Sequence, residues 1–129
     1  MGRILMSINP IHVEKILSGV KRFEYRKVKC AKKIDTILVY ATAPIMKVVG
    51  EVEVLDILSN TPTDIWECTK KASGISRAFF DQYFEGYKTA VAYALGKVTL
   101  YQIPLDLSEL GVKSPPQSFV YLENTNSEK

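Results

Sequence analysis

The sequence predicts an α+β fold in which the strands form a mixed or mostly antiparallel sheet. Three observations lead to this prediction. The 129 residues are enough for one domain with a hydrophobic core. Hydrophobic residues make up 47% and charged residues 24%, which is typical of a soluble globular protein. Segments with strand periodicity outnumber those with helical periodicity, and the short connections between them favour antiparallel neighbours.

The first two elements are a strand and a short helix. Apolar and other residues alternate over Arg3–Ile8, which predicts a strand. Asn9 then supplies a helix N-cap, and Pro10 suits the first helical position because its missing N–H is not needed there. We expect this helix to run to about Ser18, where Gly19 ends it.

Three strands are expected to follow. Residues alternate again over Arg22–Val28, and a basic loop comes after them. Thr36–Ala41 is a continuous apolar run, which suits a central strand, and Val48–Ile57 is a long alternating strand.

Two helices are predicted in the second half of the chain. Thr61 caps the first, with the acidic Asp64 three positions on, and this helix is expected to end near Gly74. Ser76 caps the second, which Gly86 ends. Four aromatic residues at helical spacing are assigned to core or lid packing: Phe79, Phe80, Tyr83 and Phe84.

The last predicted strands are Thr89–Leu95 and Val98–Ile103, joined as a hairpin by Gly96-Lys97. Residues 1–122 are expected to form a single domain, and the polar residues 123–129 a disordered tail. No apolar run approaches the ~20 residues of a membrane helix, and residues 1–7 are too short and too alternating for the apolar region expected of a signal peptide. We therefore expect a cytoplasmic protein without a membrane partner.

Positive charge is concentrated in one segment. Residues 21–33 contain seven Lys or Arg and one acid, a net charge of +6, whereas the whole chain carries +3. A basic segment on an otherwise mildly acidic protein indicates a partner with phosphates, although a solvated surface loop has the same composition. The basic residues are Lys21, Arg22, Arg26, Lys27, Lys29, Lys32 and Lys33.

Several kinds of chemistry are excluded by composition. The chain lacks a glycine-rich phosphate loop and a GxSxG nucleophile motif. Cys30 and Cys68 are isolated and are expected to be free thiols. With His12 they number fewer than the four ligands of structural zinc, so no metal or cofactor is expected. His12, early on the first helix, is expected to have a surface or capping role.

The strongest local pattern is GxKxxExR, which runs from Gly19 to Arg26. Glu24 and Arg26 are two residues apart on a strand and therefore share a face. Arg26 can form a planar fork to a carboxylate or a phosphate, and Glu24 can orient it or accept from a base edge. A structural ion pair explains the same spacing equally well. Tyr40 and Tyr93 lie on strands and could present a stacking face to a base, as an alternative to core packing.

The chain resembles the ASCH domain family of the PUA-like superfamily. The resemblance is carried in order over roughly residues 3–122 by Ser7-Ile8-Asn9-Pro10, Ile16-Leu17-Ser18-Gly19, the GxKxxExR stretch, Tyr40-Ala41-Thr42-Ala43-Pro44, Val49-Gly50-Glu51, Phe80, Tyr83, Phe84, Ala90-Val91-Ala92-Tyr93-Ala94-Leu95 and Pro115-Pro116-Gln117-Ser118-Phe119. It implies a PUA-like mixed or antiparallel barrel of about five or six strands with two to three helices at its openings. It also implies an RNA-binding cleft beside the first helix, lined by Lys21, Glu24 and Arg26, with Ser7 and Asn9 nearby.

One branch of the superfamily that the chain resembles consists of small amidohydrolases that deacylate a modified cytidine. Lys21 matches their lysine, but Glu24 stands where they have threonine, and Glu67 is a loose match for their downstream acid. This departure puts that activity in doubt.

Three functions stay open from sequence. The first is a module that binds single-stranded RNA or a nucleotide, linked to transcription or translation, with Lys27, Lys29 and Lys32 on phosphates. The second is a hydrolase acting on a nucleoside or an RNA phosphodiester, with Lys21 and Glu24 as catalytic residues. The third is a protein-interaction domain whose basic patch meets an acidic partner. The sequence does not indicate an oligomeric state.

Overall fold

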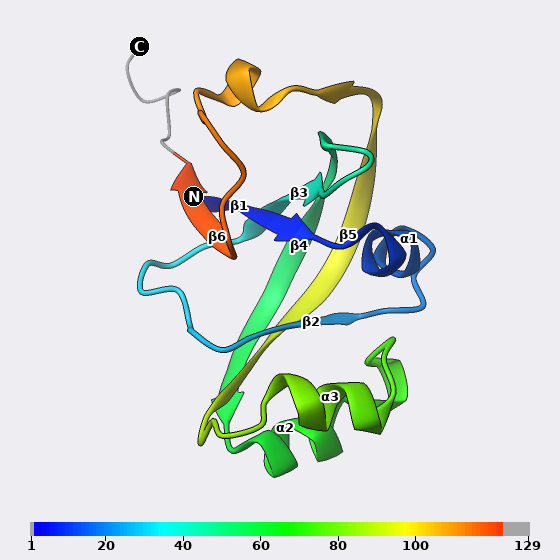
Figure 1. Cartoon of the computed structure of the whole chain (residues 1–129), viewed down its shortest axis with the longest axis vertical. Coiled ribbons are helices and arrows are strands. Elements are labelled where there is room, and N and C mark those ends of the chain that lie inside the picture. The colour runs from blue at the N-terminus through cyan, green and yellow to red at the C-terminus, as the bar shows by residue number, and fades with distance from the viewer. Residues whose placement is uncertain (1, 123–129) are drawn as a thin grey trace.

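The computed structural model describes residues 2–122, and the predicted tail, 123–129, lies outside them. Six strands form one curled sheet in the order β2-β5-β4-β3-β1-β6, with three α-helices packed around it (Figure 1). The strands are β1 (Arg3–Ile8), β2 (Phe23–Arg26), β3 (Thr36–Ala41), β4 (Lys47–Asn60), β5 (Ala90–Leu105) and β6 (Phe119–Leu122). The helices are α1 (Pro10–Leu17), α2 (Pro62–Thr69) and α3 (Arg77–Tyr83), with short 3-10 turns η1 (Lys70–Ala72) and η2 (Leu107–Leu110).

The sheet is mixed, as expected. β1 pairs with β3 in parallel, whereas every other pairing is antiparallel. The longest pairing joins β4 to β5, which extend together across the molecule (Figure 1). No helix among residues 2–122 is long and apolar enough to cross a membrane.

Helix starts follow the predicted caps. The side chain of Asn9 accepts from the Ile11 N–H at 3.0 Å, and Thr61 accepts from the Asp64 N–H at 3.2 Å. Ser76 likewise accepts from Phe79 N–H at 3.1 Å. Helix α2 is shorter than predicted because the chain tightens into η1 after Thr69 instead of continuing to Gly74.

The predicted hairpin at Gly96-Lys97 is wrong, because β5 runs unbroken past these residues. Val52 pairs with Val98 and Val54 pairs with Leu95, so two residues of β5 lie opposite Glu53 alone. This arrangement is a β-bulge, and the Lys97 N–H donates to the Glu53 carboxylate at 3.2 Å. A glycine-containing dipeptide suits a bulge as well as a turn, and the long partner strand β4 decides between them.

Strand β6 was not predicted. It consists of four residues that follow a proline-rich stretch, and it pairs with β1 antiparallel at the edge of the sheet. The Tyr121 hydroxyl accepts from Ala31 N–H at 2.6 Å, which holds β6 to the basic loop after β2.

The hydrophobic residues form three clusters. Ile4, Met6, Val13 and Ile16 belong to the largest, between the sheet and α1. A second lies under α2 and α3, and a third covers the opposite face of β1 and β3. Because successive residues of a strand point to opposite faces, β1 and β3 are buried on both sides.

Candidate functional site

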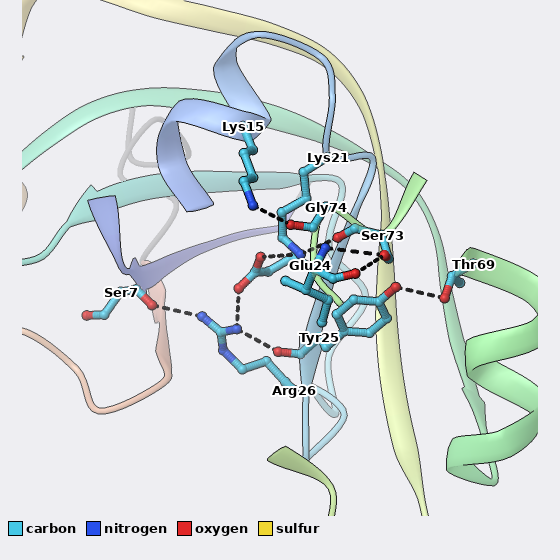
Figure 2. A network of polar contacts seen from close by, with 10 residues as sticks. Ser7, Lys15, Lys21, Glu24, Tyr25, Arg26, Thr69, Ser73 and Gly74 are labelled. Atoms are coloured by element: carbon cyan, nitrogen blue, oxygen red, sulfur yellow. Dashed lines mark hydrogen bonds and ion pairs between the residues drawn. The ribbon is translucent and has the colours of Figure 1, made fainter. Parts of the chain in front are cut away.

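Lys21 is a buried lysine in the turn between α1 and β2. Its side chain is 2% exposed. The ammonium donates to the Ser73 carbonyl at 2.7 Å and lies 3.6 Å from Glu24 Oε1, which is an ion pair slightly longer than a hydrogen bond (Figure 2). It also lies 4.8 Å from the centre of the Tyr25 ring. Lys21 thus reaches the carboxylate of Glu24, which lies on β2.

Glu24 and Arg26 share one face of β2, as their spacing predicted. Arg26 Nη1 donates to Glu24 Oε2 at 2.5 Å and to the Tyr25 carbonyl at 2.6 Å. Its other nitrogen, Nη2, donates to the Ser7 carbonyl at 2.8 Å (Figure 2). Arg26 therefore joins β2 to the end of β1, and both cations of the GxKxxExR pattern are directed at one carboxylate.

The loop after η1 closes over this network. Lys15 Nζ donates to the Gly74 carbonyl at 2.8 Å, next to the Ser73 carbonyl that Lys21 holds. The Tyr25 hydroxyl bonds Thr69 Oγ1 at 2.7 Å (Figure 2). Two lysines from the N-terminal part of the chain therefore hold this loop, and Tyr25 holds the end of α2 that leads into it, about fifty residues away in sequence.

A cleft of about 230 Å³ opens above these residues. It lies between the start of α1 and helix α3, with β2 as its floor. The lining residues are Ser7, Ile8, Asn9, His12, Lys21, Glu24, Tyr25, Arg26, Ile75, Phe79 and Tyr83.

Burial perturbs the titration of several cleft residues. It lowers the pKa of Lys21 below its usual range, although Glu24 opposes this effect. It also lowers the pKa of His12, again against the attraction of Glu24. Burial raises the pKa of Tyr25 to about 12. A lysine with a lowered pKa beside a carboxylate can exchange protons with a bound ligand more readily than a solvent-exposed lysine.

Two buried polar atoms of the cleft have no partner within hydrogen-bond distance among the described residues, namely His12 Nδ1 and Glu24 Oε1, the latter held only by the longer 3.6 Å ion pair with Lys21. An unpaired buried acceptor or donor costs free energy, so such groups in a cleft indicate a place where a ligand completes the bonding. Within residues 2–122, no group of three or more His, Cys, Asp or Glu side chains is arranged to hold a metal ion.

The structure brings together five of the residues singled out from sequence, since Ser7, Asn9, Lys21, Glu24 and Arg26 all line the cleft. Ser7 is held there by a bond from its hydroxyl to the Pro116 carbonyl at 2.7 Å. The remaining candidates lie elsewhere.

Two tyrosines considered for base stacking are core residues. Tyr40 is 2% exposed and packs with Leu38 on the face of β3 opposite the main core, because the alternation of the strand turns it away from the cleft. Tyr93 is fully buried, and its hydroxyl accepts from Cys30 N–H at 3.3 Å. Neither lines the cleft.

The lysines of the basic loop are outside the cleft. The ammonium of Lys27 lies 4.6 Å from the ring centres of both Tyr83 and Tyr87, so it sits behind one wall of the cleft. Lys29 and Lys32 are exposed and border a separate hollow beside β4. Glu67 is exposed and pairs with Lys70 at 2.8 Å, away from Lys21.

Three of the other cleft residues, His12, Phe79 and Tyr83, were given different roles from sequence. His12 neither caps α1 nor lies free on the surface, because its ring faces the cleft 5.6 Å from Phe79. Core or lid packing was expected of Phe79 and Tyr83. Tyr83 does pack against Phe84, with the ring centres 4.7 Å apart, and also lines the cleft, whereas Phe79 is 46% exposed there. Phe79 and Tyr83 are four residues apart and therefore share one face of α3, while Phe80 and Phe84 share another. This spacing was a usable signal that the two pairs have different surroundings.

The fold and the sequence were compared with those of known proteins. No protein-family model matches the chain. The crystal structure of ASCH from Zymomonas mobilis superposes with a TM-score of 0.86 and 25% identity, covering 98% of this chain and 91% of that one. A curated protein of the same organism, named an ASCH domain-containing ribonuclease, is 28% identical over 97% of this chain and 87% of its own length.

The chain is therefore similar over nearly its whole length to proteins named as ASCH domains. The PUA-like α+β fold expected from the resemblance is confirmed by the same superposition, with six strands and three helices around a curled sheet. The N-terminal domain of McrB from Staphylothermus marinus is more distant, with a TM-score of 0.61 and 15% identity, and it shows likeness of fold alone.

The chain also matches parts of two longer proteins from Ureaplasma parvum. One is named ATP synthase subunit alpha (33% identical) and the other large ribosomal subunit protein uL22 (32% identical). Each match covers 93% of this chain but only 15% and 39% of the respective relative. The likeness is therefore to a segment of each relative.

Proposed function

We propose that this protein binds single-stranded RNA and holds one nucleotide of it in the cleft. The observation that carries the proposal is the buried Lys21–Glu24–Arg26 network, which leaves Glu24 Oε1 without a hydrogen-bond donor among the described residues. The name of the Zymomonas mobilis relative, a ribonuclease, supports RNA as the ligand.

The chemistry of the cleft suits an unpaired nucleotide. Glu24 Oε1 can accept a hydrogen bond from the amino or imino group of a base, and His12 Nδ1 offers a second polar partner. A base must leave its duplex to enter so small a cleft, and unpaired bases are already free to do so. This difference favours single strands over duplex RNA.

The basic loop would bind the sugar–phosphate backbone on either side of that nucleotide. The loop leaves the cleft at Lys27, and Lys29 and Lys32 are exposed farther along it. Contacts between lysines and phosphates release counterions, so the affinity should fall as salt is added.

The test is fluorescence anisotropy of a short single-stranded RNA at low and high salt. Wild type is compared with Lys21→Met, which keeps the length of the side chain and removes its charge, and with Lys88→Met at an exposed position outside the cleft. Binding that weakens with salt and with Lys21→Met alone would support the proposal. Equal affinity of all three proteins, or none, would count against it.

A second candidate function is cleavage of the bound RNA. It is favoured by the lowered pKa of Lys21, by its distance of 3.6 Å from Glu24 and by the ribonuclease name of the relative. A neutral Lys21 would take the proton of a ribose 2′-hydroxyl as that oxygen attacks the adjacent phosphorus. The bond from phosphorus to the 5′ oxygen then breaks, and the lysine returns the proton to the leaving oxygen.

Electrophoresis of the RNA after each binding measurement tests this second candidate. Cleavage by wild type and Lys88→Met, but not by Lys21→Met, would support it. The rate should rise with pH and level off below the ordinary lysine pKa of 10.5, because burial favours the neutral amine. Intact RNA in every lane would leave binding as the function of the cleft.

A further inference from the structure

Helix α3 carries two aromatic faces with different surroundings. Phe80 and Phe84 point into the core, where Phe80 lies 5.2 Å from the Tyr25 ring and 5.0 Å from Trp66. Phe79 and Tyr83, each one position earlier, line the cleft instead. Tyr83 also packs partly against this core, with its ring 4.7 Å from that of Phe84, but core packing does not explain Phe79.

The Phe79 ring lies at the cleft, where few core contacts stabilise an apolar side chain. It is 46% exposed, and the nearest aromatic ring is that of His12, 5.6 Å away at an angle of 45°. An exposed phenyl ring at the edge of a cleft that also holds unpartnered polar atoms is typical of a ligand site. In Figure 1, α3 and α1 lie on opposite sides of β2. Phe79 of α3 and His12 of α1 both line the cleft.

We infer that Phe79 and Tyr83 form a stacking wall for the base of the nucleotide held over Glu24. This inference rests on the proposed function and adds to it which residues bind the base. The two rings come from one face of α3, and the acceptor Glu24 Oε1 lies in the same cleft. A base is flat with polar edges, so a site for one needs an aromatic wall for its face and a polar group for its edge.

Lys27 completes the site on the far side of Tyr83. Its ammonium lies 4.6 Å from the Tyr83 ring centre and at the same distance from Tyr87. These cation–π contacts hold a positive charge beside the stacking wall, at the point where the basic loop begins. Lys27 is therefore within reach of the phosphate next to the stacked base, whereas Lys29 and Lys32 contact phosphates farther along the RNA.

The stacking wall formed by Phe79 and Tyr83 can accept any of the four bases, because every base has an aromatic face. The edge contact with Glu24 is what discriminates, since a carboxylate accepts hydrogen bonds and does not donate them. A base that presents an amino group is therefore favoured over an analogue in which that group is replaced by hydrogen.

The experiment uses a short single-stranded RNA that contains a fluorescent purine analogue whose emission is quenched when it stacks on an aromatic ring. Three variants are compared with wild type: Phe79→Ala removes the ring, Phe79→Trp keeps one, and Ile103→Ala removes an exposed apolar side chain outside the cleft. Anisotropy of an end-labelled copy of the RNA reports binding independently of stacking, and thermal unfolding checks that every variant is folded.

Wild type, Phe79→Trp and Ile103→Ala should quench the analogue, and Phe79→Ala should not. The affinity of Phe79→Ala should fall about tenfold, which lies within the range of one base–aromatic stack. Quenching that survives in Phe79→Ala, or is absent in wild type although Lys21 still governs binding, would overturn the stacking wall and leave the proposed function intact. Absence of any salt-dependent RNA binding by wild type would overturn both.

Discussion

Gly74 lies directly against the side chain of Lys21. The ammonium of Lys21 donates to the carbonyl of Ser73, the residue before Gly74, although the two are 52 positions apart in sequence. A Cβ on Gly74 would come within 2.6 Å of Lys21 Cβ, which is closer than real side chains approach. Gly74 also has a φ of +73°, in the left-handed region. The absence of a side chain at this glycine is thus what lets Lys21 reach the cleft.

Gly74→Ala should destabilise the protein more than Gly86→Ala. Gly86 has a similar φ of +84°, but nothing lies within 4 Å of its missing Cβ, so Ala there costs only backbone strain of about 1–2 kcal/mol. At Gly74 the clash with Lys21 should add about 1–3 kcal/mol. Urea unfolding of the two variants measures the difference, and equal losses would show that the loop yields without strain.

Glu24→Gln should lower the free energy of unfolding by about 3–5 kcal/mol, because it leaves the buried Lys21 and the partly buried Arg26 without their counter-charge. Glu67→Gln is the matched control, since Glu67 also pairs with a lysine three residues away but is exposed. That change should have almost no effect. Urea unfolding checks both, and a loss as small for Glu24 as for Glu67 would contradict the importance of the network.

His12 is the only histidine, so its imidazole NMR signals can be titrated without ambiguity. The midpoint should lie below 6.5, because burial and the cations Lys21, Lys15 and Arg26 disfavour the charged ring more than Glu24 favours it. A midpoint at or above 6.5 would contradict this environment.

The same shift makes a prediction for stability. Below about pH 6.5 the unfolded chain binds a proton at His12 that the folded chain does not, so stability falls as the pH drops towards the folded pKa. Wild type should lose stability over this window relative to His12→Gln, which has no such group. Parallel curves of unfolding free energy against pH would refute the prediction.

If the basic loop binds phosphates, Lys29→Ala and Lys32→Ala should each reduce the salt dependence of RNA binding. The slope of log affinity against log salt should become shallower by about 0.7 for each lysine removed. Lys88→Ala and Lys113→Ala remove the same charge at exposed positions outside the loop and should leave the slope unchanged. An unchanged slope in the loop variants would show that the backbone follows another surface.

Local chemistry in the sequence was enough to predict several features of this protein. The caps Asn9, Thr61 and Ser76 lie where expected, because a cap acts on amides only two or three residues away. Glu24 and Arg26 share a face for the same local reason, since the period of a strand is two. The ASCH resemblance then led to the PUA-like fold.

Features that depend on distant partners were decided only by the tertiary structure. The long strand β4 makes Gly96-Lys97 a bulge and not a turn, and the segment around Leu107–Leu110 covers the face of β3 that carries Tyr40. Phe79 and Phe80 have the same side chain, yet one meets the cleft and the other the core. Sequence periodicity shows which residues share a face, but the burial of that face depends on which distant segment packs against it.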